Sequence, residues 1–139
     1  LFWEGNSDAL NFKTEKNVIH GFLINSDSTI SFLEHSLTKL GLNEKEQTDF
    51  ITYWAPRMIQ KQFAFVQFLV DEDYDAKITE LSVTPKPDSQ RRIYMLFKPL
   101  EKPHVFFDYG TQELPTFKRS GLTLIEWGGS ELKNSELIP

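Results

Sequence analysis

The chain has 139 residues, of which 40% are hydrophobic and 14% aromatic, so it carries enough apolar surface to bury a core without disulfides or metals and is not a disordered chain. Its 15 basic and 20 acidic residues give a net charge of −5 and form no long block of one sign. A phosphate-tracking surface needs clustered Lys and Arg, so we expect no nucleic-acid partner.

The first residues are unusually apolar for a chain terminus. Leu1, Phe2 and Trp3 would be costly to leave in water and resemble the interior of a strand. We therefore expect them to dock into the core as part of a sheet that begins upstream. Turn-forming and charged residues at 6–17 predict a loop, and 18–24 predicts a short strand interrupted by Gly21.

Two helices are predicted next. Polar residues at 25–28 mark a helix start, an apolar stripe follows at three- and four-residue steps, and Gly41 supplies the left-handed residue that commonly closes a helix. Asn43 and Glu46 have capping-box spacing for the second helix, whose stripe includes Trp54. Because Pro56 lacks an N–H group, we expect this helix to end or kink near Ala55.

Strands are predicted beyond the helices. The run 63–70 is apolar on both faces, as a covered central strand would be, and an acidic loop follows at 71–75. Partial alternation at 78–84, a proline-rich turn at 85–88 and clear alternation at 92–100 together predict a hairpin-like strand pair. We further expect an edge strand at 105–107, a loop at 108–120 and a last strand at 122–127 that Gly128 and Gly129 end.

This order of elements groups the helices apart from the strands. It predicts an α+β domain over 1–139, in which a two-helix pair packs on a mostly antiparallel sheet of four to six strands. The longest apolar stretch, 63–70, is far shorter than the ~20 residues that span a bilayer, so we expect no membrane insertion.

Motifs for bound groups are missing from the sequence. It contains neither a Gly-rich phosphate loop nor a GxSxG elbow, and the absence of Cys excludes thiolate zinc sites and thiol nucleophiles. His20, His35 and His104 lie on separate segments without metal-ligand spacing. We expect no metal and no cofactor.

A pair of carboxylates is the strongest enzymatic signal. Glu4 and Glu126 each adjoin a Trp and lie within one or two residues of a Gly at the end of an apolar segment. If the two segments are neighbours, burial beside the indoles would raise a carboxyl pKa, as a general acid requires. The alternative, which we favour, is that each Glu pairs with one of the arginines or with backbone N–H groups.

Aromatic and Arg side chains are candidates for binding, because such residues dominate protein interfaces. Tyr53 and Arg57 lie one helical turn apart, and both can be exposed while Trp54 faces the core. The remaining candidates are Trp3, Phe107, Tyr109 and Trp127. Covering a sheet edge would account for the aromatics near 107 equally well.

Several strings together resemble a family of uncharacterised bacterial proteins. They are Leu-Phe-Trp-Glu-Gly at 1–5, Phe-Leu-Glu at 32–34, Leu-Gly-Leu-Asn-Glu-Lys-Glu at 40–46, Asp-Phe-Ile at 49–51 with Tyr53-Trp54-x-Pro56, Pro-Lys-Pro-Asp at 85–88, and Gly121 through Glu126-Trp127-Gly128-Gly129. Members of that family carry an upstream β-rich segment with a Lys-Pro-Val-Ile-Tyr-Leu-Tyr-Pro-like signature. The resemblance implies such a segment before Leu1, and it implies no activity.

Three hypotheses for function follow. We favour a non-catalytic binding or assembly module of a larger bacterial protein or complex, in the envelope or outside the cell. Its partner would be another polypeptide or the upstream segment of the same protein, which would supply further strands. The alternatives are a hydrolase of glycans or peptides that uses Glu4 and Glu126, and a small-molecule carrier lined by Phe63, Phe65, Phe68 and Phe97.

Overall fold

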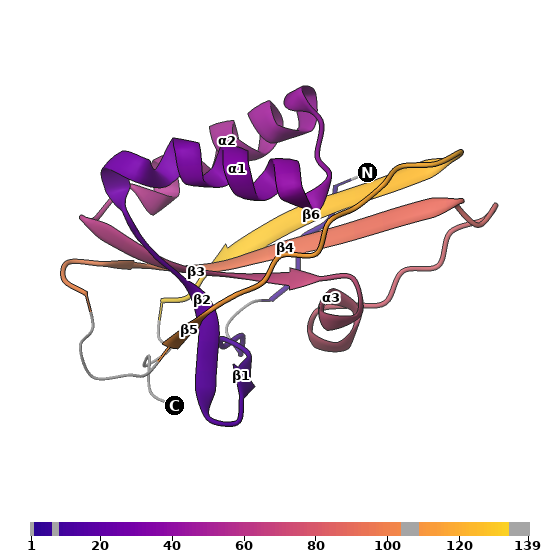
Figure 1. Ribbon diagram of the computed structural model, residues 1–139. Coiled ribbons are helices and arrows are strands. Elements are labelled where there is room, and N and C mark those ends of the chain that lie inside the picture. Colours follow the sequence, from indigo (N-terminus) through magenta and orange to yellow (C-terminus); the bar gives the residue numbers. More distant parts are fainter. Residues whose placement is uncertain (1, 7–8, 104–108, 134–139) are drawn as a thin grey trace.

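A computed structural model describes residues 2–6, 9–103 and 109–133 (Figure 1). A six-stranded, mostly antiparallel sheet has the order β1-β2-β3-β4-β6, and β5 pairs with β2 beside that path. Two helices pack on one face of this sheet, which confirms the predicted α+β class. The strands are β1 (Thr14–Glu15), β2 (Val18–Asn25), β3 (Phe63–Val70), β4 (Ser89–Leu100), β5 (Tyr109–Thr111) and β6 (Thr123–Glu131). The helices are α1 (Thr29–Leu40), α2 (Glu44–Met58) and α3 (Glu72–Lys77).

The helix pair forms from local signals. Gly41 adopts a φ of 97° and its N–H group bonds to carbonyls of the last turn of α1, as predicted. At the start of α2, Asn43 Oδ1 accepts from the N–H of Glu46 over 3.0 Å, and the N–H of Asn43 donates to Glu46 Oε2 over 2.8 Å. Such a capping box stabilises a helix start by about 1 kcal/mol.

Of the end or kink expected near Ala55, the end does not occur there, because α2 continues through Pro56 to Met58. Met58 is completely buried against the sheet. The N–H of Ile59 bonds to the carbonyl of Ala55, so the last turn stays closed without the missing N–H of Pro56. Burying a Met side chain contributes about 2 kcal/mol, which offsets much of the cost of a proline within a helix.

The sheet separates two apolar cores. As predicted for a covered central strand, residues 64–69 of β3 are buried. Their side chains alternate, so that Phe68 packs beneath the helices while Phe65 packs on the opposite face, where Phe12 meets it at 5.0 Å. Phe97 lies on the helix side and Phe63 on the other. The four phenylalanines therefore do not line one cavity, and the predicted carrier site is wrong.

The expected strand at 78–84 is also wrong, as is its hairpin with 92–100. No strand forms at 78–84, because β4 already pairs with β3 on one side and with β6 on the other. The acidic residues 71–75 lie at the start of α3 instead of forming a loop. Carboxylates in a first turn favour the positive end of a helix, and Tyr74 anchors α3 by being buried.

The last strand is longer than predicted. Gly128 and Gly129 do not end β6 but pair with Tyr94 and Met95 of β4 inside it, and β6 continues to Glu131. The loops expected at 6–17 and 108–120 contain the short strands β1 and β5. The edge strand expected at 105–107 lies outside the described residues.

Residues 2–6 form no strand, and the side chain of Phe2 is 78% exposed, so the expectation that this segment docks into the core as a strand is wrong. Trp3 is partly covered, because its indole nitrogen donates a hydrogen bond to Glu126 of β6. None of the helices in the described ranges combines the length and the apolar character needed to cross a membrane.

Candidate functional site

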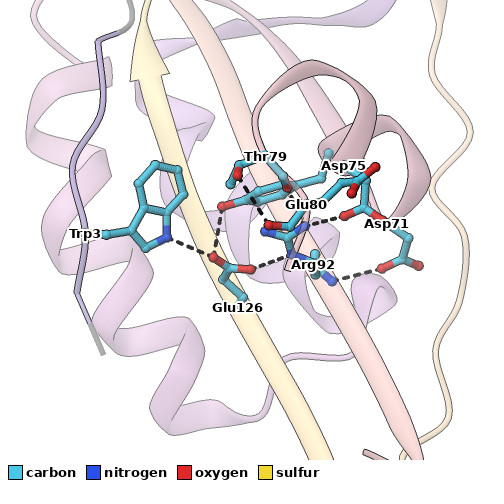
Figure 2. A network of polar contacts seen from close by, with 8 residues as sticks. Trp3, Asp71, Asp75, Thr79, Glu80, Arg92 and Glu126 are labelled. Atoms are coloured by element: carbon cyan, nitrogen blue, oxygen red, sulfur yellow. Dashed lines mark hydrogen bonds and ion pairs between the residues drawn. The ribbon is translucent and has the colours of Figure 1, made fainter. Parts of the chain in front are cut away.

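A buried arginine organises the polar residues of the sheet face opposite the α1–α2 pair (Figure 2). Arg92 of β4 is 1% exposed. Its Nε donates to Glu126 Oε2 over 2.5 Å, and its Nη1 donates to the carbonyl of Thr79 over 2.7 Å and to Asp75. The guanidinium also lies 4.0 Å from the ring centre of Tyr74. A buried charge is tolerated only with such partners.

Glu126 is the carboxylate that Arg92, Trp3 and Tyr74 share. Trp3 Nε1 donates to its Oε1 over 3.0 Å, and the hydroxyl of Tyr74 donates to the same oxygen over 3.2 Å. Burial by itself raises the pKa of Glu126, but the hydrogen bonds from Arg92, Trp3 and Tyr74 outweigh it and hold the pKa below its ordinary value. Glu126 is therefore held as an anion paired with Arg92, which confirms for this residue the favoured interpretation of an ion pair and not the raised pKa of a general acid.

Asp71 extends this network to the end of β3. Its Oδ1 accepts from the backbone N–H of Arg92 over 2.8 Å, and its Oδ2 lies 3.2 Å from Arg91 Nε. Asp71 has a φ of 51°, and its own N–H bonds to the carbonyl of Arg92. These bonds fix the turn from β3 into α3.

Glu4 takes no part in this network. It is exposed, and within the described part of the chain it forms neither a hydrogen bond nor an ion pair. A general acid must hold a proton near neutral pH and present it to a substrate. Glu126 instead is ionised and has both oxygens engaged, so the geometry gives the hydrolase hypothesis no support.

Two of the predicted binding residues, Trp3 and Trp127, contact β6 or lie in it. Two others, Tyr53 and Arg57, lie on α2 beside Trp54, whose ring packs against Gly129 of β6. Trp127 meets Phe50 of α2 at a ring distance of 5.2 Å, on the helix side of the sheet. On the same side, the guanidinium of Arg57 lies 3.9 Å from the ring centre of Tyr53. Trp3 contacts β6 from the opposite face, through Glu126, as Figure 2 shows.

The other two binding candidates do not join this group. Tyr109 lies on β5, which pairs with β2, and its ring meets that of Phe65 at 5.4 Å. Phe107 is outside the described residues.

The position of β6 in the sheet leaves one of its sides open. In the described ranges β6 pairs only with β4, so the backbone groups on its other side have no strand partner. Proteins commonly protect such edges by short strands, Lys or Pro. This edge strand has nine residues and contains neither Lys nor Pro.

A polar cleft of about 380 Å³ was not predicted from the sequence. Two glutamine amides at this cleft replace strand pairing where β2 turns away from β3. Gln67 bonds to both the N–H and the carbonyl of Lys13, at 2.7 and 2.9 Å. Gln112 bonds in the same way to the N–H and the carbonyl of Phe68, at 2.9 and 2.6 Å. Only the isolated polar position of Gln67 in an apolar strand signals this arrangement in the sequence.

Charged groups line the same cleft. Lys13 Nζ lies 2.8 Å from Asp73 and 3.1 Å from Glu15. The hydrogen bond to Asp73, joined by the contact with Glu15, outweighs burial and raises the pKa of Lys13. Within the described residues, no three His, Asp or Glu side chains are placed to hold a metal ion. His104 lies outside those residues.

Comparisons with protein-family models, with curated proteins and with solved structures found no match to the chain. Membership of the uncharacterised bacterial family therefore stays a prediction.

Proposed function

We propose that this protein is a non-catalytic binding or assembly module of a larger bacterial protein or complex, and that it takes up an extended strand of another polypeptide at the open edge of β6. The observation that carries this proposal is the nine-residue edge strand, paired on one side only in the described part of the chain. Strand addition gains affinity from main-chain hydrogen bonds and specificity from the side chains beside the edge.

Two further observations support the proposal. Trp3 contacts β6 from one face, and on the other face Trp127 packs against α2, which also carries the binding candidates Tyr53 and Arg57. Such aromatic and Arg residues are common anchors at interfaces. The carboxylate of Glu126 in this strand is occupied by internal partners and not arranged for proton transfer. Both features suit a rigid platform better than a reaction site.

Hydrogen exchange of β6 amides tests this function. The probe is an acetylated nine-residue peptide of alternating Thr and Val with Lys at both ends, added at millimolar concentration. Strand addition predicts slower exchange of edge amides in Thr123–Glu131. The matched control is the same peptide N-methylated at alternate residues, which removes the donors of one peptide edge. If exchange is unchanged by the first peptide, or slows equally with both peptides, strand addition is ruled out.

A further inference from the structure

A hydrogen-bond donor without a partner lies above the second half of β6. Trp54 is 8% exposed, and its Nε1 has no acceptor among the described residues. A Cβ built on Gly129 would lie 2.9 Å from Trp54 Cζ2 and 3.1 Å from Cε2, the atom bonded to Nε1. The indole nitrogen is thus bonded to an atom that packs against β6. Leaving such a buried donor unsatisfied is destabilising, so a ligand that supplies an acceptor gains affinity there.

A cation lies beside this donor. The Arg57 guanidinium lies 3.9 Å from the ring centre of Tyr53 and 5.9 Å from that of Trp54. One of its N–H groups donates to the carbonyl of Tyr53, and in the described residues no carboxylate pairs with it. A guanidinium has five N–H donors, so most of its capacity remains open.

Gly129 lets the Trp54 ring lie directly against the backbone of β6 at this point of the edge. Because Gly129 has no side chain, a residue of an added strand placed opposite it meets the Trp54 ring instead of a cross-strand side chain. The group that suits this place must accept hydrogen bonds from both an indole and a guanidinium. An ionised carboxylate does so, and its charge complements Arg57.

We propose that the strand bound by β6 carries an Asp or Glu side chain opposite Gly129, which pairs with Arg57 and accepts the hydrogen bond of Trp54 Nε1. This inference rests on the proposed function, because it names the chemistry of the segment that the edge selects. The tyrosine ring beneath Arg57 holds the guanidinium in place, so that less side-chain freedom is lost on binding.

Peptide variants test the carboxylate. The central residue of the Thr/Val peptide is replaced with Glu, with Gln or with Lys. We expect the Glu peptide to bind about tenfold more tightly than the Gln peptide, as a charge-assisted hydrogen bond allows, and the Lys peptide to bind more weakly than both. The indole N–H resonance of Trp54, assigned with Trp54→Phe, should shift with the Glu peptide and not with the Gln peptide.

Protein variants complete the test. Arg57→Gln should bring the affinities for the Glu and Gln peptides within about twofold of each other, because the charge partner is gone. Lys45→Gln removes an exposed charge at the other end of α2 and should leave the tenfold preference intact. Circular dichroism checks that both variants fold.

The outcomes separate the two proposals. Equal affinity for the Glu and Gln peptides, with β6 exchange still slowed, overturns the carboxylate and leaves strand addition standing. If the Arg57→Gln variant still binds the Glu peptide more tightly than the Gln peptide, the proposed carboxylate contact is also overturned. If no peptide slows exchange in β6, both proposals fail.

Discussion

Trp3 Nε1 donates a hydrogen bond to Glu126 Oε1 although the two residues are 123 positions apart in the chain. The other oxygen of the same carboxylate binds the buried Arg92. One side chain of β6 therefore joins the N-terminal segment to β4. Loss of the Glu126 carboxylate should therefore destabilise the fold.

Glu126→Gln should lower the free energy of unfolding by about 3 kcal/mol. The neutral amide leaves part of a completely buried guanidinium charge uncompensated, which is costly even though Arg92 keeps Asp75 and the carbonyl of Thr79. Urea denaturation measures the change. The control is Glu4→Gln, the same substitution at an exposed position, which should change stability by less than about 0.5 kcal/mol. Equal effects of the two substitutions would contradict a structural role for the ion pair.

The ionised carboxylate of Glu126 should also make the free energy of unfolding depend on pH, so that the protein is less stable in acid. Because the fold lowers the pKa of Glu126, the folded protein binds fewer protons than the unfolded chain as the pH approaches 4.5, the ordinary value. The stabilisation is complete above that value and disappears as the pH falls through the lower pKa of the folded state. Unfolding free energies measured from pH 7 to pH 3 should drop, and the drop should be shallower in Glu126→Gln. Parallel pH profiles for the two proteins would refute this assignment.

Gln112→Leu should loosen the attachment of 109–113 to β3. The substitution leaves the N–H and the carbonyl of Phe68 without their amide partner, at a cost of about 2 kcal/mol. Amide hydrogen exchange should show a faster rate at Phe68. Gln60→Leu makes the same chemical change at an exposed position and should leave that rate unaltered. A slow Phe68 amide in Gln112→Leu would show that this side chain does not replace a strand partner.

Gly129→Ala should destabilise the protein by about 2 kcal/mol, because the added methyl group would lie 2.8 Å from the carbonyl of Met95 and 2.9 Å from Trp54. Gly128→Ala is the matched neighbour. The methyl group added at 128 would lie 3.3 Å from the ring of Tyr94, and within the described residues no atom outside the two chain neighbours would lie closer. This substitution should destabilise the protein by less than about 1 kcal/mol. Thermal unfolding compares the two variants, and a reversed order would contradict the close packing of α2 on β6.

The helix pair and the central strand could be predicted from the sequence because their signals are local. The cap at Gly41 and the box formed by Asn43 and Glu46 depend on atoms within five residues of each other. The continuous apolar run of β3 by itself predicts that both faces of this strand are buried. The α+β grouping follows from these elements in their order, since helices and strands with one apolar side must bury it against each other.

The edge and the polar network depended on pairings that no local pattern encodes. Whether 78–84 forms a strand depends on which strands already flank β4, and the length of β6 depends on the neighbours that Gly128 and Gly129 have across the sheet. The sequence leaves open whether the pKa of Glu126 rises beside its indole neighbour or whether Glu126 pairs with an arginine, which is the favoured interpretation. The pKa is lowered because Arg92, 34 positions away in the chain, forms a hydrogen bond with Glu126. The sequence alone thus determined the helices, the central strand and the fold class through short-range hydrogen bonds and periodic burial. The tertiary structure decided which strand edge stays open among the described residues and which charges are paired, because both depend on contacts between distant parts of the chain.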